Sequence, residues 1–158
     1  MNARIRTIAL ASALVVAATP ATLSAAGGDG PYGDLVHDRH ENFEEIGDAF
    51  KVIRDQLRGE VEEDFGAMDA AADVILGYST QIPDWFPAGS GPQDGYDTDA
   101  LASIWEDWDT FASRAADLPP RVEALKAAIG TGEMGEVLDA FRATGGACKA
   151  CHDDFRAE

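Results

Sequence analysis

Five residues close to the end of the sequence, Cys148-Lys149-Ala150-Cys151-His152, combine two thiols and an imidazole at fixed spacing. Two cysteines separated by two residues and followed by histidine are typical of a c-type haem attachment site. Each thiol adds to one haem vinyl group and becomes a thioether. On a helix, residues three apart share a face, so both sulfurs can meet one edge of the macrocycle. The spacing therefore predicts a covalent haem with His152 as the axial iron ligand.

Three other sites use the same residue types. A redox Cys-x-x-Cys pair usually lies in a βαβ setting, and no strand alternation flanks this one. A zinc site could add His37 and His40 to the two cysteines, although the spacing between the pairs matches no common Cys2His2 module. A structural disulfide between Cys148 and Cys151 suits helical geometry poorly. Haem attachment is the favoured interpretation, with zinc as the remote alternative.

The first residues predict export. Arg4 and Arg6 precede an apolar run over residues 8–18, and small residues follow at Ser24-Ala25-Ala26. This is the pattern of a cleaved secretory signal peptide over residues 1–26, too short for a stable membrane anchor. The mature domain would span residues 27–158, and no later apolar run could cross a bilayer. Export to a bacterial periplasm fits covalent haem attachment, which is completed outside the cytoplasmic membrane.

The chain is strongly acidic. Its formal net charge is −17, and removing the signal peptide with its two arginines makes it −19. Such a charge argues against nucleic acids and anionic membranes as partners. It is compatible with a basic docking partner, or simply with a well-solvated surface.

Apolar residues recur every three or four positions, the period of an amphipathic helix. The periodicity predicts helices over residues 34–57, 62–78, 99–129 and 133–156, the third beginning after a cap at Asp97 or Thr98 and kinked or divided at Pro119-Pro120. A loop rich in glycine and proline separates the second and third helices, and its Trp85 and Phe86 should pack down. The fold class expected is all-α, an antiparallel four-helix bundle with covalently attached haem c.

The last predicted helix should place its haem-binding residues on its core face. Its expected apolar stripe is Leu138, Phe141, Gly145, Cys148, His152 and Phe155. Glycine weakens a helix, so Gly145 and Gly146 are expected to permit a close approach of the backbone to the macrocycle.

The sequence resembles the cytochrome c′ family over nearly the whole mature chain. The resemblance is carried by the C-terminal attachment motif with the following Asp153-Asp154-Phe155-Arg156, by Arg39…Phe43, by Gly59-Glu60 and by Ile104-Trp105. It implies a haem between the helices and, often, a homodimer. It also implies that the first helix supplies the residue at the sixth iron position, four residues after an arginine.

That position is Phe43, which cannot bind iron, whereas a low-spin relative has methionine there. Met68 and Met134 fall elsewhere in the pattern. The resemblance therefore implies a five-coordinate, high-spin haem under an apolar distal side. His40, which the resemblance places at the haem edge, is the minority candidate for a sixth ligand in a low-spin electron carrier.

Two arginines complete the expected site. Arg39 shares a helix face with Phe43, and an arginine on a core-facing stripe needs an anion, for which the resemblance implies a haem propionate. The alternative is a surface pair with Glu45. Arg156, four residues after His152, could cover the proximal pocket or contact the imidazole, or be a frayed terminal charge.

Two functions follow from these residues. A five-coordinate iron under Phe43 can take NO or CO, while bound O2 would lack a hydrogen-bond donor. A periplasmic electron carrier is the second possibility. No acid–base constellation for enzymatic turnover is evident, so the sequence predicts a gas-binding or electron-transfer protein and not an enzyme.

Overall fold

The computed structural model describes residues 30–157, and the predicted signal peptide lies outside this range. Four long helices form an antiparallel bundle: α1 (Gly33–Leu57), α2 (Phe65–Ser79), α5 (Leu118–Thr131) and α6 (Met134–Phe155). Shorter pieces join them: the 3-10 turns η1 (Ile82–Trp85) and η2 (Pro92–Asp94), and helices α3 (Ser103–Glu106) and α4 (Trp108–Ala116). The all-α fold class is thereby confirmed, and the described residues contain no strand, only one isolated bridge between Ala100 and Arg156.

The first helix agrees with its predicted range, and the second begins later than predicted. Helix α1 ends where Gly59 adopts φ +68° and its amide donates to Gln56 O at 2.9 Å. This left-handed conformation suits glycine, which has no Cβ to clash. Helix α2 begins at Phe65 because the Asp64 carboxylate accepts a hydrogen bond from the Ala67 amide, a helix-capping interaction that fixes the start.

The prediction of one continuous third helix is wrong. The chain forms α3, breaks at Asp107, continues as α4 and restarts as α5. Asp107 leaves helical geometry with φ −131° and ψ 63°, and its side chain caps α4 by accepting from the Thr110 amide. Pro119 and Pro120 lie in the first turn of α5, where a proline needs no hydrogen-bond partner for its nitrogen. The prolines therefore start a separate helix, the alternative that the sequence left open.

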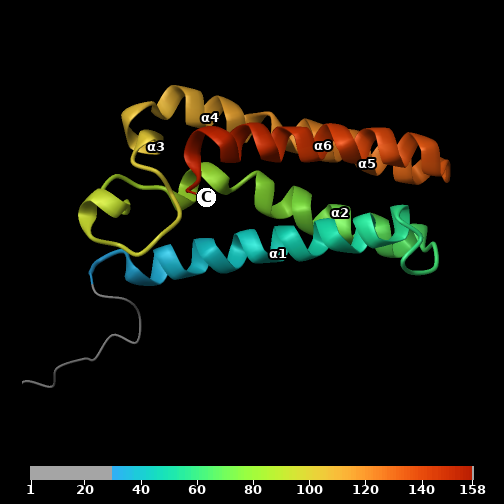
Figure 1. Cartoon of the computed structure of the whole chain (residues 1–158), viewed down its shortest axis with the longest axis horizontal. Helices are drawn as coiled ribbons and strands as arrows, with labels where there is room; N and C mark the ends of the chain where they lie inside the picture. The colour runs from blue at the N-terminus through green and yellow to red at the C-terminus, as the bar shows by residue number, and fades with distance from the viewer. Residues whose placement is uncertain (1–29, 158) are drawn as a thin grey trace, which may run out of the picture.

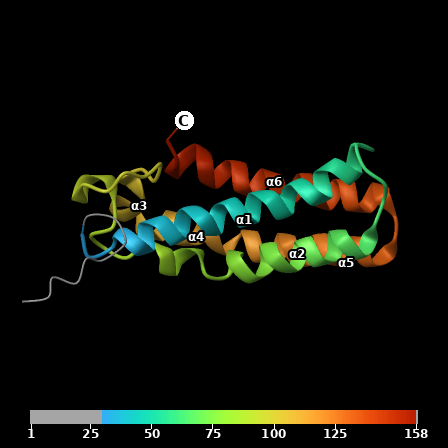
Figure 2. The same ribbon diagram turned by 90° about the horizontal axis from the view of Figure 1, so that it is seen from below.

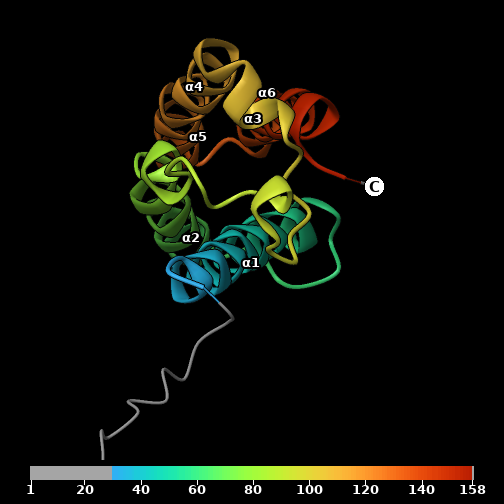
Figure 3. The same ribbon diagram turned by 90° about the vertical axis from the view of Figure 1, so that its left-hand side faces the viewer.

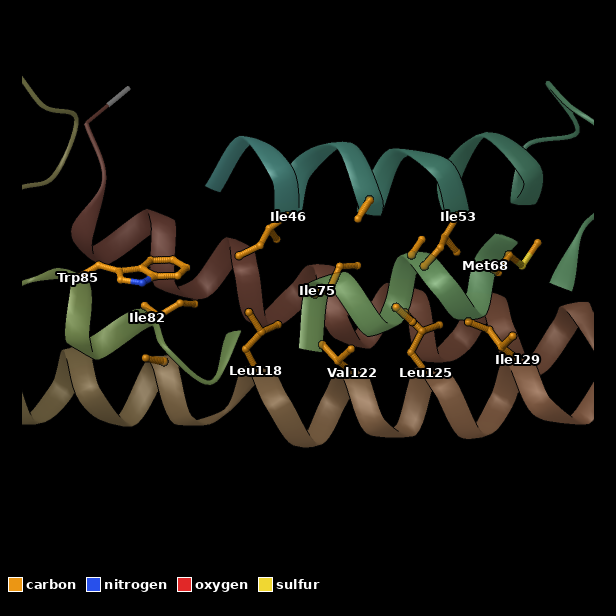
Figure 4. Close-up of a cluster of buried hydrophobic side chains, with 14 of the residues drawn as sticks. Ile46, Ile53, Met68, Ile75, Ile82, Trp85, Leu118, Val122, Leu125 and Ile129 are labelled. Carbon is orange, nitrogen blue, oxygen red and sulfur yellow. The ribbon is translucent and has the colours of Figure 1, made fainter. Parts of the chain in front are cut away.

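The core runs along the bundle axis. Figure 4 shows aliphatic side chains from α1, α2 and α5 pointing toward one another; Ile53, Val122 and Leu125 are fully buried. Each side chain of this size contributes about 1.5–3 kcal/mol when it leaves water. Helix α1 packs on α2, α2 on α5 and α5 on α6, whereas the backbones of α6 and α1 make few close approaches. The side of the bundle formed by α1 and α6 is therefore held together mainly by side-chain contacts.

The long connection between α2 and α3 crosses one end of the bundle (Figure 1) and packs down, as predicted. Trp85 and Phe86 are both buried. The Trp105 indole N–H of α3 lies 3.2 Å from Phe86 O and 3.0 Å from Pro87 O, so it donates to the connection's backbone. None of the helices within residues 30–157 has the length and apolar character required to cross a membrane.

Candidate haem-attachment site

The two cysteines lie on the last two turns of α6. Both side chains are half-buried against the hydrophobic core, and both are free thiols. Their positions three residues apart on a continuous helix give them one shared face. The disulfide between Cys148 and Cys151, which the sequence analysis disfavoured, is not formed in this structure.

The surroundings of the thiols also argue against a redox pair. Burial raises the pKa of the Cys148 thiol, and burial together with the neighbouring Cys148 raises the pKa of Cys151 to about 11. Reactive Cys-x-x-Cys pairs show the opposite shift, because nearby positive charge stabilises their thiolate. Both groups are neutral thiols near neutral pH, held against apolar side chains.

His152 lies one residue beyond Cys151 and is exposed on α6. Desolvation by the surrounding protein, and then the positive charge of Arg156, lower the pKa of His152. The neutral imidazole, which is the form that binds iron, is therefore favoured. Arg156 itself is exposed, with its guanidinium 3.3 Å from Asp99 Oδ2 and its amide donating to His152 O at 3.0 Å. The structure thus ties Arg156 to Asp99 and to the helix end, not to the imidazole ring.

The predicted core-facing stripe of α6 needs correction. Val137, Thr144 and Phe155 are the buried residues, while Leu138, Phe141, Gly145 and both cysteines are half-buried. The apolar stripe predicted from sequence is thus one edge of the buried face. The reason is that α5 covers one side of α6 closely, whereas the side toward α1 is less tightly packed. The attachment motif lies at this boundary between core and solvent.

Helices α1 and α6 meet through aromatic side chains. The Phe50 and Phe141 rings stack with centroids 4.0 Å apart, and a Cβ added to Gly145 would lie 3.3 Å from Phe50 Cζ. Gly145 therefore admits the Phe50 ring, whereas Gly146 has open space around it. Because the two helices run antiparallel, as Figure 2 shows, a step back along α1 matches a step forward along α6. Phe43, seven residues before Phe50, is consequently level with residues 148–152.

Phe43 contacts an aromatic wall built by the connection. Its ring meets Trp85 edge-on at a centroid distance of 5.3 Å and lies 6.3 Å from Phe86. Phe86 continues the wall to Trp105 and to Phe111 at 6.0 and 4.9 Å. These contacts surround Phe43 with apolar surface.

Arg39, one turn before Phe43, is only 3% exposed. Its Nη2 donates to Ser90 O at 3.0 Å and Thr98 Oγ1 at 2.9 Å, and its Nη1 approaches Ser90 Oγ at 3.3 Å and Trp85 O at 3.5 Å. Burial lowers the pKa of this arginine, although it remains a cation at neutral pH. None of its partners among the described residues is a carboxylate, so the alternative pairing with Glu45 is wrong.

The other two histidines lie on the outer surface of α1. His37 Nε2 is 3.1 Å from Glu41, and His40 Nε2 is 3.3 Å from Glu44, each pair one turn apart and exposed. The structure therefore does not bring His37 and His40 to the cysteines. Within residues 30–157 no group of three or more histidine, cysteine or acidic residues is arranged to hold a metal ion, so the Cys2His2 zinc alternative is wrong.

The donor set fits haem c. Two free thiols share one face, and an adjacent histidine favours its neutral form. Phe43 of the facing helix lies level with them and packs against the aromatic wall of the connection. An antiparallel four-helix bundle that carries this motif at its C-terminal end defines a c-type cytochrome.

Comparisons with known proteins show to which family of c-type cytochromes the chain is similar. The family model described as Cytochrome C′ matches residues 34–156. Cytochrome c′ from Cereibacter sphaeroides is 32% identical over 147 residues, which cover 92% of this chain and 95% of that protein. Among solved structures, cytochrome c′ described as from Rhodobacter Spheriodes has a TM-score of 0.75 at 29% identity, covering 82% of this chain and 99% of that one.

A further solved structure is a nitric oxide complex of a cytochrome c′ variant from Alcaligenes xylosoxidans. It has a TM-score of 0.70 and 25% identity, and covers 79% of this chain and 95% of that one. The chain belongs to the cytochrome c′ family, whose members carry one covalent haem c and serve in gas binding or electron transfer.

Sequence reasoning missed how the residues around the site are connected. It placed Phe141 on the apolar stripe of the last helix but did not pair it with Phe50 of the first, and it did not connect Trp85 or Thr98 with the first helix. The spacing signal was present for the pair, because both belong to apolar stripes of facing helices. The contacts of the connection have no periodic signal.

Proposed function

We propose that this chain is a periplasmic cytochrome c′ with a five-coordinate, high-spin haem iron that binds NO or CO. Cys148 and Cys151 would form the thioethers and His152 would be the proximal ligand. When bound, the haem supplies an iron centre that changes oxidation state and takes small diatomic ligands. The alignment of Phe43 with residues 148–152, through the Phe50–Phe141 stack, is the observation that carries the proposal.

The side chains around Phe43 are aromatic and offer no ligand atom to the iron. Phe43 is enclosed by Trp85 and Phe86, and the only hydrogen-bond donor on these three side chains is the Trp85 indole. The Phe43 ring, which would face the iron, carries no donor, and this favours neutral diatomics over O2, because bound O2 is polar and requires a donor. No side chain in this wall can act as a general acid or base, which supports gas binding or electron transfer over enzymatic turnover.

The flanking residues have supporting roles in this proposal. Arg39 keeps its Nε–H for a haem propionate, since its four other N–H groups face oxygens of the connection. Arg156, anchored by Asp99, would place a positive charge beside the proximal histidine and tune the haem potential. His40 would lie at the haem edge; its exposed pairing with Glu44 supports that place over direct ligation.

The nitric oxide complex of the Alcaligenes xylosoxidans variant supports NO as a ligand by analogy. Optical spectra of the purified ferric and ferrous protein, with and without NO and CO, test the assignment. A high-spin spectrum that changes on gas addition is expected. A native low-spin spectrum with a sixth protein ligand would overturn it in favour of the electron carrier, and His40→Ala would then show whether histidine is that ligand.

Location and partners belong to the same proposal. Residues 1–26 would be removed on export, leaving residues 27–158 as the mature haem domain, which the mass of the periplasmic protein tests. We expect a homodimer, testable by sedimentation. The full sequence has a net charge of −17, and the mature chain, without Arg4 and Arg6, would have −19. This charge favours a basic redox partner, whose binding should weaken steeply with salt.

A further inference from the structure

The buried Arg39 side chain spans two parts of the chain that are far apart in sequence. It projects from α1 to Ser90 and Thr98, 51 and 59 residues later. Each terminal nitrogen faces two oxygens: Nη1 those of Trp85 and Ser90, and Nη2 those of Ser90 and Thr98. One planar guanidinium therefore binds residues at the start, middle and end of the 85–98 segment.

Aromatic rings cover the same group. The guanidinium carbon lies 4.7 Å from the centroid of Phe86 and 5.9 Å from that of Trp105. A cation over a ring face is stabilised by the ring quadrupole, and more strongly where water is excluded. With Arg39 3% exposed, the hydrogen bonds and these rings replace the hydration that the charge has lost.

The segment that Arg39 holds carries the wall around Phe43. Trp85 and Phe86 contact the Phe43 ring, and Trp85 O and the Phe86 ring contact Arg39. Arg39 and Phe43 are one turn apart on α1, so the helix fixes their separation. A change in the guanidinium contacts is therefore transmitted to the distal wall through Trp85 and Phe86.

We infer that Arg39 is a positioning residue that locks the 85–98 segment and thereby sets the access of small ligands to the side of the haem that Phe43 faces. This inference rests on the proposed function. It differs from a propionate contact, because it needs both terminal nitrogens of Arg39, Nη1 toward Trp85 O and Nη2 toward Thr98 Oγ1, and not the charge alone. Lysine has one terminal nitrogen, so it cannot take the places of Nη1 and Nη2 at the same time.

Thr98→Val provides the test, because it removes the Thr98 hydroxyl and leaves Arg39 intact. Thr110→Val, the same change at an exposed position of α4, is the matched control. In the haem-loaded protein, amide hydrogen exchange is followed at Phe86 and Ser90, whose amides donate to Pro83 O and Pro87 O. Neither amide donates to the Thr98 side chain, so the substitution removes neither of these hydrogen bonds itself.

Thr98→Val and Arg39→Gln are each expected to speed exchange at Phe86 and Ser90 by about tenfold, the factor for a lost hydrogen bond to a charged group worth about 1.4 kcal/mol. CO association should also become faster in both variants. The double variant should exchange no faster than Arg39→Gln alone, because the two residues act through one contact.

Three results would overturn the inference: Thr98→Val behaving like Thr110→Val, faster exchange with unchanged CO association, or wild-type behaviour of Arg39→Lys. Failure of the proposed function is distinguished separately, because it would appear as a low-spin or gas-insensitive spectrum of the wild-type protein.

Discussion

The Phe50 ring of α1 stacks on the Phe141 ring of α6, with centroids 4.0 Å apart and planes 18° apart. This contact joins α1 and α6, whose backbones make few close approaches to each other. It lies two turns from Cys148 in one helix and two turns from Phe43 in the other. The stacked pair therefore sets the register in which the Cys-x-x-Cys-His run lies level with Phe43.

The stack predicts opposite effects at two adjacent glycines of α6. Alanine is a better helix former than glycine by about 1 kcal/mol, and Gly146 has open space, so Gly146→Ala should stabilise the protein. Gly145→Ala would place its Cβ 3.3 Å from Phe50 Cζ and disturb the stack. Overpacking of this kind costs about 1–3 kcal/mol, so we expect net destabilisation. Denaturant unfolding of both variants measures the difference; equal stabilisation would contradict the close approach.

Phe43→Ala should speed CO binding, because removing a large side chain leaves a cavity beside Trp85. Phe43→Met could instead supply a sulfur ligand and shift the optical spectrum toward low spin. Flash photolysis and absorption spectra measure the two effects. Phe65→Ala, at the start of α2, is a control for loss of a half-buried phenylalanine elsewhere. Unchanged CO rates in Phe43→Ala would place Phe43 away from the ligand.

Replacing Cys148 and Cys151 together with alanine should abolish covalent haem. The wild-type protein is expected to retain haem through denaturing electrophoresis and acid–acetone extraction, whereas the double variant should lose it. The bundle should also become less stable, since a bound cofactor stabilises the folded state that holds it. Haem staining of the gel and thermal unfolding are the measurements. Extractable haem in the wild type would refute thioether attachment.

Lys126 of α5 forms ion pairs with two aspartates of α2, and we expect their contribution to stability to depend on pH. Its Nζ lies 2.8 Å from Asp69 and 2.5 Å from Asp73, and these hydrogen bonds raise the pKa of the lysine. A raised pKa stabilises the fold at pH values below the unfolded pKa of about 10.4 and ceases to do so as the pH rises through the folded value.

Lys126→Met should therefore lower the free energy of unfolding at pH 8 by about 1 kcal/mol or less, the range for a solvent-accessible pair. The difference from wild type should shrink above about pH 10.4. Denaturant unfolding at both pH values measures it, with Lys51→Met, an exposed lysine of α1, as the control. A difference that does not change with pH would point to lost packing of the lysine stem.

The long helices were predictable because their residues repeat at the helical period. The ranges of α1 and α6 agree with prediction to within a residue at each end. The break at Asp107 was missed, because the apolar rhythm continues through it while the Asp107 side chain caps the next helix. A single capping hydrogen bond overrode a periodic signal.

In the candidate site, too, some residues could be predicted from the sequence and some contacts could not. The attachment motif needs only local spacing, so the sequence by itself predicted Cys148, Cys151 and His152, whereas the resemblance to the cytochrome c′ family singled out Phe43 and Arg39. The partners of Arg39 could not be deduced, since Ser90 and Thr98 lie in a loop without periodicity, more than fifty residues away.

Local chemistry is encoded in residue order: a Cys-x-x-Cys-His run and the helical period need no distant partner to be recognised. Only the tertiary structure decided which face of α6 is buried, that Gly145 admits Phe50, and that a buried cation is held by neutral oxygens. The physical reason is that these features depend on how helices and loops far apart in the chain pack together, and packing selects among arrangements that the local sequence leaves equally possible.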